Sequence, residues 1–189
     1  MMVPLPPRHR RRQRRLFGLH QVEFHGVNLR VTVTKRAAEV DQWVSEVVHN
    51  NRLVLHNLIV GLDIEWHPCL VGEHNPVATL QLCVGKTCLI FQLLHRDYTP
   101  HSLIAFLANP QFTFVGVGVG DDAQKLRLDH GLVVGRRGGL PFGAVYEDGV
   151  EENGVGSCGN GDGEAIRKIG IKLFVSLQRV TGTGIPFSC

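Results

Sequence analysis

Two pairs of carboxylates mark where this chain could do chemistry. Asp63 and Glu65 lie two residues apart within the apolar segment Leu58–Trp66. Residues two apart in a strand project from one face, and ionised carboxylates are costly to bury there unless a cation compensates them. Their oxygen ligands suit Mg²⁺ or Mn²⁺. Asp121 and Asp122 follow a second apolar segment, and we expect Asp122 to join the first pair where the two segments converge.

Each pair also has a plainer interpretation. An Asp-x-Glu pattern occurs more often at a strand end in water, or in a salt bridge to a lysine, than in a metal site. An aspartate at a helix start can satisfy free N–H groups, and we favour this capping role for Asp121. The apolar surroundings of Asp63 and Glu65 favour the metal site over these alternatives.

Apolar periodicity predicts the elements that hold these residues. Apolar and alternating patterns predict strands over residues 21–24, 28–34, 58–66, 78–84, 87–92 and 112–119. Helical spacing and terminal signals predict helices over residues 37–49, 100–109 and 121–130. The second helix would have Thr99 as its N-cap and Pro100 at its first position, and the third would end at Gly131. The segment 58–66 is apolar on both faces, which indicates a central strand, so we predict an α/β fold with a mixed sheet flanked by helices.

The basic residues are unevenly distributed. The 189 residues carry a net charge of +3, from 20 basic and 17 acidic residues. Six arginines lie close together near the N-terminus: Arg8, Arg10, Arg11, Arg12, Arg14 and Arg15. Without them the balance is 14 minus 17, or −3, so the remainder cannot bind nucleic acid through a broad basic field. We expect a basic disordered arm over residues 1–16 that binds nucleic acid or serves as a nuclear address, with a solvated tail as the alternative.

The cysteines and the hydropathy indicate a cellular compartment. No Cys-x-x-Cys pair occurs among the five cysteines, Cys69, Cys83, Cys88, Cys158 and Cys189. We therefore expect reduced, buried thiols and, with no apolar signal segment near the N-terminus, an intracellular protein of the nucleus, the cytoplasm or both. No stretch approaches the roughly 20 uncharged apolar residues of a membrane span, which predicts a soluble protein without a membrane partner.

The C-terminal third differs from the rest in composition. Residues 135–163 contain ten glycines and five acidic residues without a sustained apolar period, so they bury too little surface to offset the entropy of ordering them. Residues 164–177 regain a weak pattern. We therefore divide the chain into the basic arm (1–16), a folded domain (17–134) and a glycine-rich, largely disordered tail (135–189).

Three segments together resemble a known family. Gly61–Trp66, Ala78–Cys83 and Phe114–Leu126 are similar to the 3′–5′ exonuclease domain of the Werner-syndrome type, in its plant-like form, over residues 17–134. This is a DEDDy family with a ribonuclease-H-like fold. The resemblance implies two-metal hydrolysis of a terminal phosphodiester, with Asp63 and Glu65 holding Mg²⁺ or Mn²⁺.

The same resemblance assigns further roles. It implies that Asp122 supports one metal through water and that the substrate is nucleic acid, with DNA preferred over RNA and a helicase as a candidate protein partner. Trp66 follows the end of the strand, where it could stack on the terminal base, although we favour core packing for it. Lys125 could contact phosphate, although we favour exposure to solvent.

The family's third motif does not occur in this sequence. That motif is a tyrosine followed four residues later by an aspartate, but Ser102 follows Tyr98 and Val150 follows Tyr146 at this spacing. We interpret the C-terminal third as foreign to the family, as in a truncated, alternatively spliced or misannotated gene. Loss of a positioned proton acceptor costs about 10²–10⁴ in rate. We therefore expect a domain that is incomplete at its C-terminus and weakly active or inactive; the alternative is a catalytically silent module that binds nucleic acid or a protein.

Overall fold

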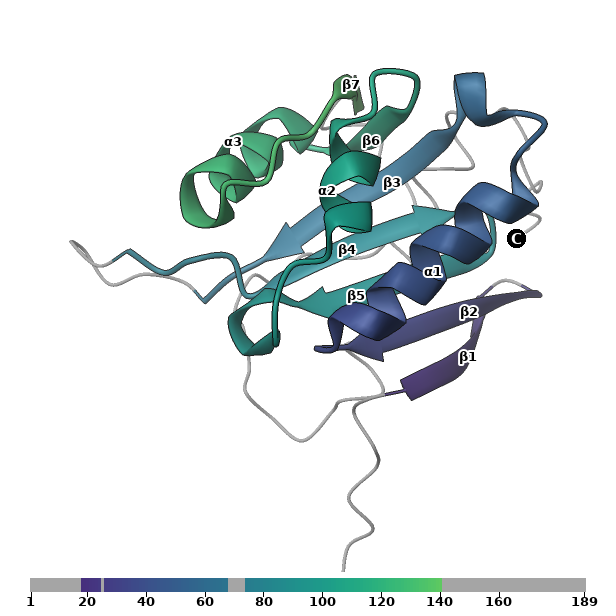
Figure 1. Ribbon diagram of the computed structural model, residues 1–189, viewed down its shortest axis with the longest axis horizontal. Helices are drawn as coiled ribbons and strands as arrows, with labels where there is room; N and C mark the ends of the chain where they lie inside the picture. The colour runs from purple at the N-terminus through teal and green to yellow at the C-terminus, as the bar shows by residue number, and fades with distance from the viewer. Residues whose placement is uncertain (1–17, 25, 68–73, 141–189) are drawn as a thin grey trace, which may run out of the picture.

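The computed structural model describes residues 18–24, 26–67 and 74–140. These residues form one seven-stranded sheet and three α-helices (Figure 1). The strands are β1 (Gly18–Phe24), β2 (Val27–Thr34), β3 (Ile59–Glu65), β4 (Thr79–Val84), β5 (Thr87–Gln92), β6 (Thr113–Val117) and β7 (Arg136–Leu140). The helices are α1 (Ala37–Asn50), α2 (His101–Ala108) and α3 (Val119–His130), with short 3₁₀ turns at Leu55–Asn57 and Leu93–His95. The basic arm lies outside the described residues, as does the tail beyond residue 140.

The sheet is mixed, as predicted. Its strands are ordered β1-β2-β5-β4-β3-β6-β7. The hairpin β1–β2 and the meander β3-β4-β5 pair antiparallel, whereas β2–β5, β3–β6 and β6–β7 pair parallel. The strand β3 therefore lies inside the sheet between β4 and β6, which confirms that the apolar segment around residue 62 forms an interior strand.

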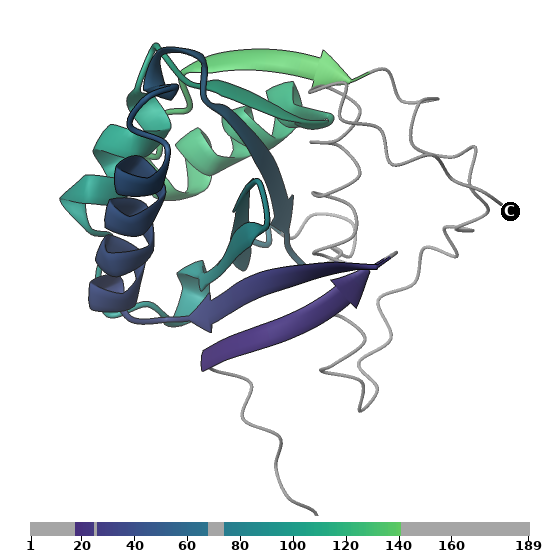
Figure 2. The same ribbon diagram turned by 90° about the vertical axis from the view of Figure 1, so that its right-hand side faces the viewer.

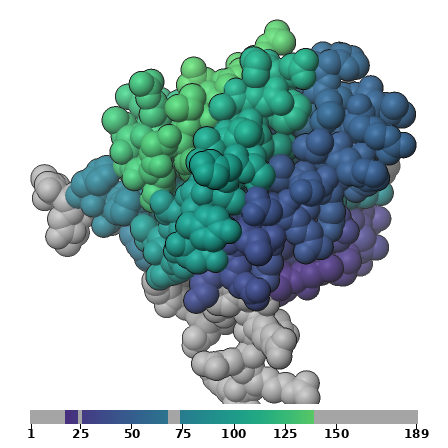
Figure 3. Space-filling model, viewed as in Figure 1, coloured from purple at the N-terminus to yellow at the C-terminus, as the bar shows by residue number. Residues whose placement is uncertain are grey.

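The three α-helices lie on one face of the sheet (Figure 2). Helix α1 forms where it was predicted because Val40, Trp43, Val44 and Val47 recur at helical spacing and are all buried. Seen from outside, the helices cover most of the sheet on this face (Figure 3). The packing of this face is therefore the main hydrophobic core of the domain.

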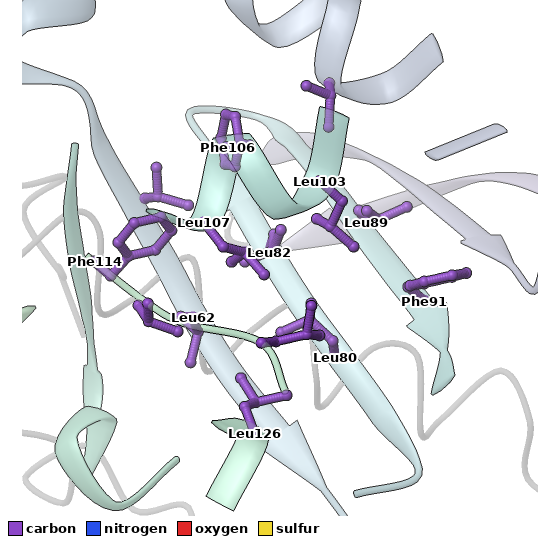
Figure 4. Packing of buried hydrophobic residues seen from close by; sticks show 14 of the residues in the cluster. Leu62, Leu80, Leu82, Leu89, Phe91, Leu103, Phe106, Leu107, Phe114 and Leu126 are labelled. Carbon is purple, nitrogen blue, oxygen red and sulfur yellow. The ribbon is translucent and has the colours of Figure 1, made fainter. Parts of the chain in front are cut away.

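Helix α2 shows how this core is filled. Leu103, Phe106 and Leu107 of α2 face strand residues such as Leu82 in Figure 4, and all belong to one buried cluster. The ring of Phe106 also lies 5.0 Å, centroid to centroid, from the ring of Phe112. Leu62 and Ile64 of β3 belong to the same cluster, so one face of β3 is fixed against the helices.

The opposite face of the sheet is apolar as well. It carries a second buried cluster that includes Val31 of β2, Ile90 of β5 and Val115 of β6. Among the residues that the structure describes, no helix contributes a side chain to this cluster. Asp63 and Glu65 project on this second face, on the side opposite to Leu62 and Ile64.

Residues 136–140 differ from the sequence expectation. They were expected in a disordered tail, but they form β7, parallel to β6 at the edge of the sheet. The composition argument considered only the apolar surface that side chains can bury. Pairing with the free edge of β6 satisfies backbone groups whatever the side chains are, so a glycine-rich segment can be ordered there.

Two cysteines also differ from the expectation of reduced thiols. Cys83 of β4 and Cys88 of β5 form a disulfide, with their Cα atoms 4.1 Å apart. They lie directly opposite one another in the β4–β5 hairpin. A search for Cys-x-x-Cys missed them because the hairpin, and not the helical or loop spacing of that motif, brings them together. The other three cysteines lie outside the described residues.

Smaller details complete the comparison with the sequence. Helix α2 begins one residue later than predicted, because Pro100 is its N-cap and not its first helical residue. Helix α3 ends at Gly131 as predicted, with a left-handed backbone at that residue. Within residues 18–24, 26–67 and 74–140, no helix is long and apolar enough to cross a lipid bilayer.

Candidate active site at the end of β3

The carboxylates of β3 lie where the sheet opens. Strand β3 pairs with β4 as far as Glu65, but it pairs with β6 only at Ile59–Gly61. Beyond Gly61, none of the described strands pairs with β3 on the β6 side. Asp63 in this stretch is half-buried and Glu65 is exposed, so both can reach solvent or a ligand.

Two glycines bring helix α3 into the space that β6 leaves. A side chain at Gly116 would collide with the carbonyl oxygen of Leu62, so only glycine allows this close approach of β6 to β3. Gly118 then adopts a left-handed backbone with φ of 69° and serves as the N-cap of α3. The chain turns sharply from β6 into α3, and α3 contacts β3 (Figure 1).

The first turn of α3 carries both predicted aspartates. Asp122 is buried, with 9% of its surface exposed, whereas Asp121 is exposed. The helix begins two residues earlier than predicted, and its N-cap, Gly118, makes no side-chain cap bond. Asp121 is therefore not the cap, and its favourable effect is limited to the helix dipole.

The structure brings the predicted residues to neighbouring elements without gathering them into a finished metal site. Asp63 and Glu65 share one face of β3, and Asp122 lies at the start of the helix that contacts this strand. Within the described parts of the chain, no three His, Cys, Asp or Glu side chains lie close enough to hold one metal ion.

Asp129, near the C-terminal end of α3, holds the segment that follows the site. Its side chain is 1% exposed and accepts a hydrogen bond of 2.8 Å from the backbone N–H of Val77. The Nζ of Lys125 lies 3.0 Å from Asp129 Oδ2, and Nε2 of His74 lies 2.9 Å from Asp129 Oδ1. Lys125 also donates to the carbonyl oxygen of Asn75. These bonds attach residues 74–77, just before β4, to α3.

The pKa of Asp129 follows from these contacts. Burial raises the pKa of this carboxyl, but the hydrogen bond from Lys125, the N–H of Val77, the charge of Lys125 and the contact with His74 outweigh burial. The pKa of Asp129 therefore lies below its ordinary value. The carboxylate is ionised at neutral pH and forms a buried salt bridge with Lys125.

Trp66 and Lys125 are placed differently from what sequence reasoning favoured. Trp66 is 42% exposed rather than packed in the core, and Nζ of Lys125 lies 5.2 Å from the centroid of its ring, a cation–π arrangement. Lys125 is mostly buried instead of facing solvent. The i,i+4 spacing of Lys125 and Asp129 was a signal for their pairing that the sequence analysis did not use.

Two polar residues of β4 were missed by sequence reasoning. Gln81 is fully buried and lies directly opposite Asp63, and Thr79 lies directly opposite Glu65. The signal was present in the sequence, since two polar residues at a spacing of two interrupt an apolar strand. The hairpin register that places them beside the carboxylates was not predictable from the pattern alone.

The relatives that the chain matches are exonucleases. Over 111 residues it is 32% identical to a 3′–5′ exonuclease of Arabidopsis thaliana, an alignment that covers 56% of this chain and 38% of that protein. Over 116 residues it is 33% identical to exonuclease 3′–5′ domain-containing protein 2 of Drosophila melanogaster, covering 61% of this chain and 19% of that protein. The chain thus spans less than half the length of these relatives. No protein-family model matches it.

Solved structures with the same fold are also exonuclease domains. A crystal structure of the EXD2 exonuclease domain superposes with a TM-score of 0.53 over 81% of this chain and 94% of that chain, at 22% identity. A crystal of that domain soaked in Mg and GMP is 29% identical, with a TM-score of 0.51, over 58% of this chain and 56% of that chain. The chain therefore resembles exonuclease domains both in sequence and in fold. The predicted ribonuclease-H-like mixed sheet flanked by helices is confirmed.

Proposed function

We propose that this chain is a metal-dependent 3′–5′ exonuclease that releases nucleotides from the end of a nucleic acid, with DNA preferred over RNA. The observation that carries the proposal is the position of Asp63 and Glu65. They lie on one face of an interior strand, and helix α3, whose first turn carries the buried Asp122, contacts this strand. Names of the relatives support the same activity.

The donor set suits a hard divalent cation. Mg²⁺ retains several waters in proteins and is bound by one or two carboxylates together with substrate phosphates. A complete protein cage of three ligands is therefore not needed in the absence of substrate. Asp63 and Glu65 would bind Mg²⁺ or Mn²⁺ directly, and Asp122 would support one ion through water. Crystals of the EXD2 exonuclease domain have been soaked in Mg and, separately, in Mn.

The chemistry is hydrolysis of the terminal phosphodiester. Bound cations supply a lowered pKa for the attacking water and stabilise the leaving 3′ oxygen. The acidic residues of the chain would hold these cations, whose positive charge would allow a polyanionic substrate to approach an acidic site. Because the Tyr-x-x-x-Asp motif is missing from the sequence, the turnover of this chain is weak.

Two further groups would contact the nucleic acid. The half-exposed ring of Trp66, beside Glu65, offers a surface on which a terminal base can stack. The arginines of the arm, Arg8 to Arg15, would add salt-dependent affinity for phosphate. The same arm would direct the protein to the nucleus, with the cytoplasm as the other compartment.

The test is release of nucleotides from a DNA duplex with a recessed 3′ end. We expect slow release that requires Mn²⁺ or Mg²⁺ and falls to background in Asp63→Ala, because that variant lacks a metal-binding carboxylate. Asp121→Ala is the matched control, since Asp121 lies in the same turn as Asp122 but is exposed, and it should keep wild-type activity. Release that persists in Asp63→Ala, or that does not need a divalent cation, would contradict the proposal.

A further inference from the structure

The carboxylates of β3 face two polar residues across the β3–β4 pairing. Asp63 is directly opposite Gln81, and Glu65 is directly opposite Thr79. Residues that are directly opposite in antiparallel strands project to the same face of the sheet, with Cβ atoms about 4.5–5.5 Å apart. The four side chains therefore form one polar group on the second face of the sheet.

The two β4 residues have buried polar atoms that are unpaired in the part of the chain that the structure describes. Gln81 is 0% exposed, yet neither its Nε2 nor its Oε1 has a hydrogen-bond partner among the described residues. The Oγ1 of Thr79 is buried and has no hydrogen-bond partner within the described ranges either. The next residue across from Gln81, Ile90 on β5, is apolar and buried. Unpaired polar atoms in such surroundings lower stability.

Because these polar residues lower the stability of an apolar strand, their presence indicates a role other than stability. The amide of glutamine can donate two hydrogen bonds and the hydroxyl of threonine one. Carboxylates that bind metals are themselves held by hydrogen bonds from neighbouring residues, and these neighbours contribute strongly to metal affinity. The donors of Gln81 and Thr79 therefore complement the acceptors that stand opposite them.

We propose that Gln81 and Thr79 are positioning residues of the exonuclease site, whose side chains donate hydrogen bonds that orient Asp63 and Glu65 for a divalent cation. The inference rests on the proposed function. It extends the site from one strand to two, and it explains why two adjacent strands alternate polar residues with the same period.

The experiment uses the full chain and measures two quantities. One is the Kd for Mn²⁺, from electron paramagnetic resonance, and the other is the Tm in EDTA. Gln81→Met keeps the length of the side chain without its polar atoms, and Thr79→Val keeps the shape of threonine without its hydroxyl. Thr79→Ser retains the hydroxyl. Gln92→Met is the matched control, because Gln92 lies opposite Thr79 on β5, one strand farther from the carboxylates.

We expect Gln81→Met and Thr79→Val to weaken Mn²⁺ binding by about 10-fold or more. Thr79→Ser and the control at Gln92 should stay close to wild type. The Tm of Gln81→Met in EDTA should be unchanged or rise by about 2–8 °C, because the unpaired polar atoms are removed. A residue with a purely structural role would show the reverse, a lower Tm with Mn²⁺ affinity unchanged.

The outcomes separate this inference from the proposed function. If the wild-type chain binds Mn²⁺ and both variants bind it equally well, the positioning role is wrong and the proposed function stands. If the wild-type chain binds no Mn²⁺, both are wrong. Weaker Mn²⁺ binding in Thr79→Val, together with wild-type binding in Thr79→Ser, would support the inference, because serine retains the hydroxyl that valine lacks.

Discussion

The two ends of helix α3 are held in place by different physical means. At its N-terminal end the chain approaches β3 closely because Gly116 has no side chain, and it turns into the helix at Gly118. At its C-terminal end Asp129 is fixed by Lys125, by His74 and by the N–H of Val77. The N-terminal end is positioned by close backbone packing that a side chain would prevent. The C-terminal end is positioned by ionic and hydrogen-bond contacts.

This difference separates the two kinds of aspartate on one helix. Asp122 stands at the helix end where a negative charge is favourable, whereas Asp129 stands at the end where it is unfavourable. A buried carboxylate at the unfavourable end is stable only with partners, and Asp129 has three. Asp129 therefore has a structural role, and Asp122 is the aspartate of this helix that we assign to the proposed site.

Removal of the charge at the C-terminal end should have the largest effect on stability. Asp129→Ala leaves Lys125 without its buried partner and releases residues 74–77 from α3, so we expect a loss of about 2–4 kcal/mol in the free energy of unfolding. Urea denaturation measures this. Asp121→Ala, an exposed change on the same helix, should stay within about 0.5 kcal/mol of wild type. Equal effects of the two changes would show that the charges around Asp129 do not hold the helix.

Addition of one methyl group at the N-terminal end should have the next largest effect. Gly116→Ala places a Cβ against the carbonyl oxygen of Leu62, so β6 and α3 must shift; we expect a loss of about 1–3 kcal/mol. Gly120→Ala is the matched control, because nothing lies within 4 Å of a Cβ at that position. Since Gly120 is helical, its replacement should raise stability by up to about 1 kcal/mol. Thermal unfolding measures both variants. If both substitutions change the stability in the same direction, the steric account is wrong.

Acid should remove part of the difference between the two ends. The pKa of Asp129 in the folded protein lies below its ordinary value, which is about 3.9 in an unfolded chain. Its contribution to stability is therefore complete above about pH 4 and is lost as the pH falls through the lower folded-state pKa. We expect the stability gap between wild type and Asp129→Asn, measured by urea denaturation, to be smaller at pH 2.5 than at pH 6. A gap that widens on acidification would mean that the pKa of Asp129 is raised on folding.

Local patterns were sufficient to predict the parts of the site that depend on one segment. The spacing of Asp63 and Glu65 within an apolar run gave their shared face, and the spacing of Val40, Trp43, Val44 and Val47 gave α1. The mixed sheet followed from the order of these elements. Each of these conclusions uses only the period of a strand or a helix.

The parts that were missed depend on register and on distant contacts. The roles of Gln81 and Cys88 depend on the residues directly opposite them, Asp63 and Cys83. Asp129 gains its meaning from His74 and Val77, which are more than fifty residues earlier in the sequence. Pairing between strands and contacts between a loop and a helix are fixed only when the whole sheet forms, so a single pass along the sequence could not predict them.

The parallel pairing of β3 with β6 has a consequence for the order of folding. The β4–β5 hairpin is closed by the two-residue turn at Gly85 and Lys86, and such local pairs form early. Pairing of Val60 with Phe114 joins residues that are 114 minus 60, or 54, positions apart, and so large a loop closes later. During synthesis the carboxylates of β3 thus leave the ribosome well before Asp122. We expect the cation affinity that we propose for this chain to be complete only after α3 has emerged and docked.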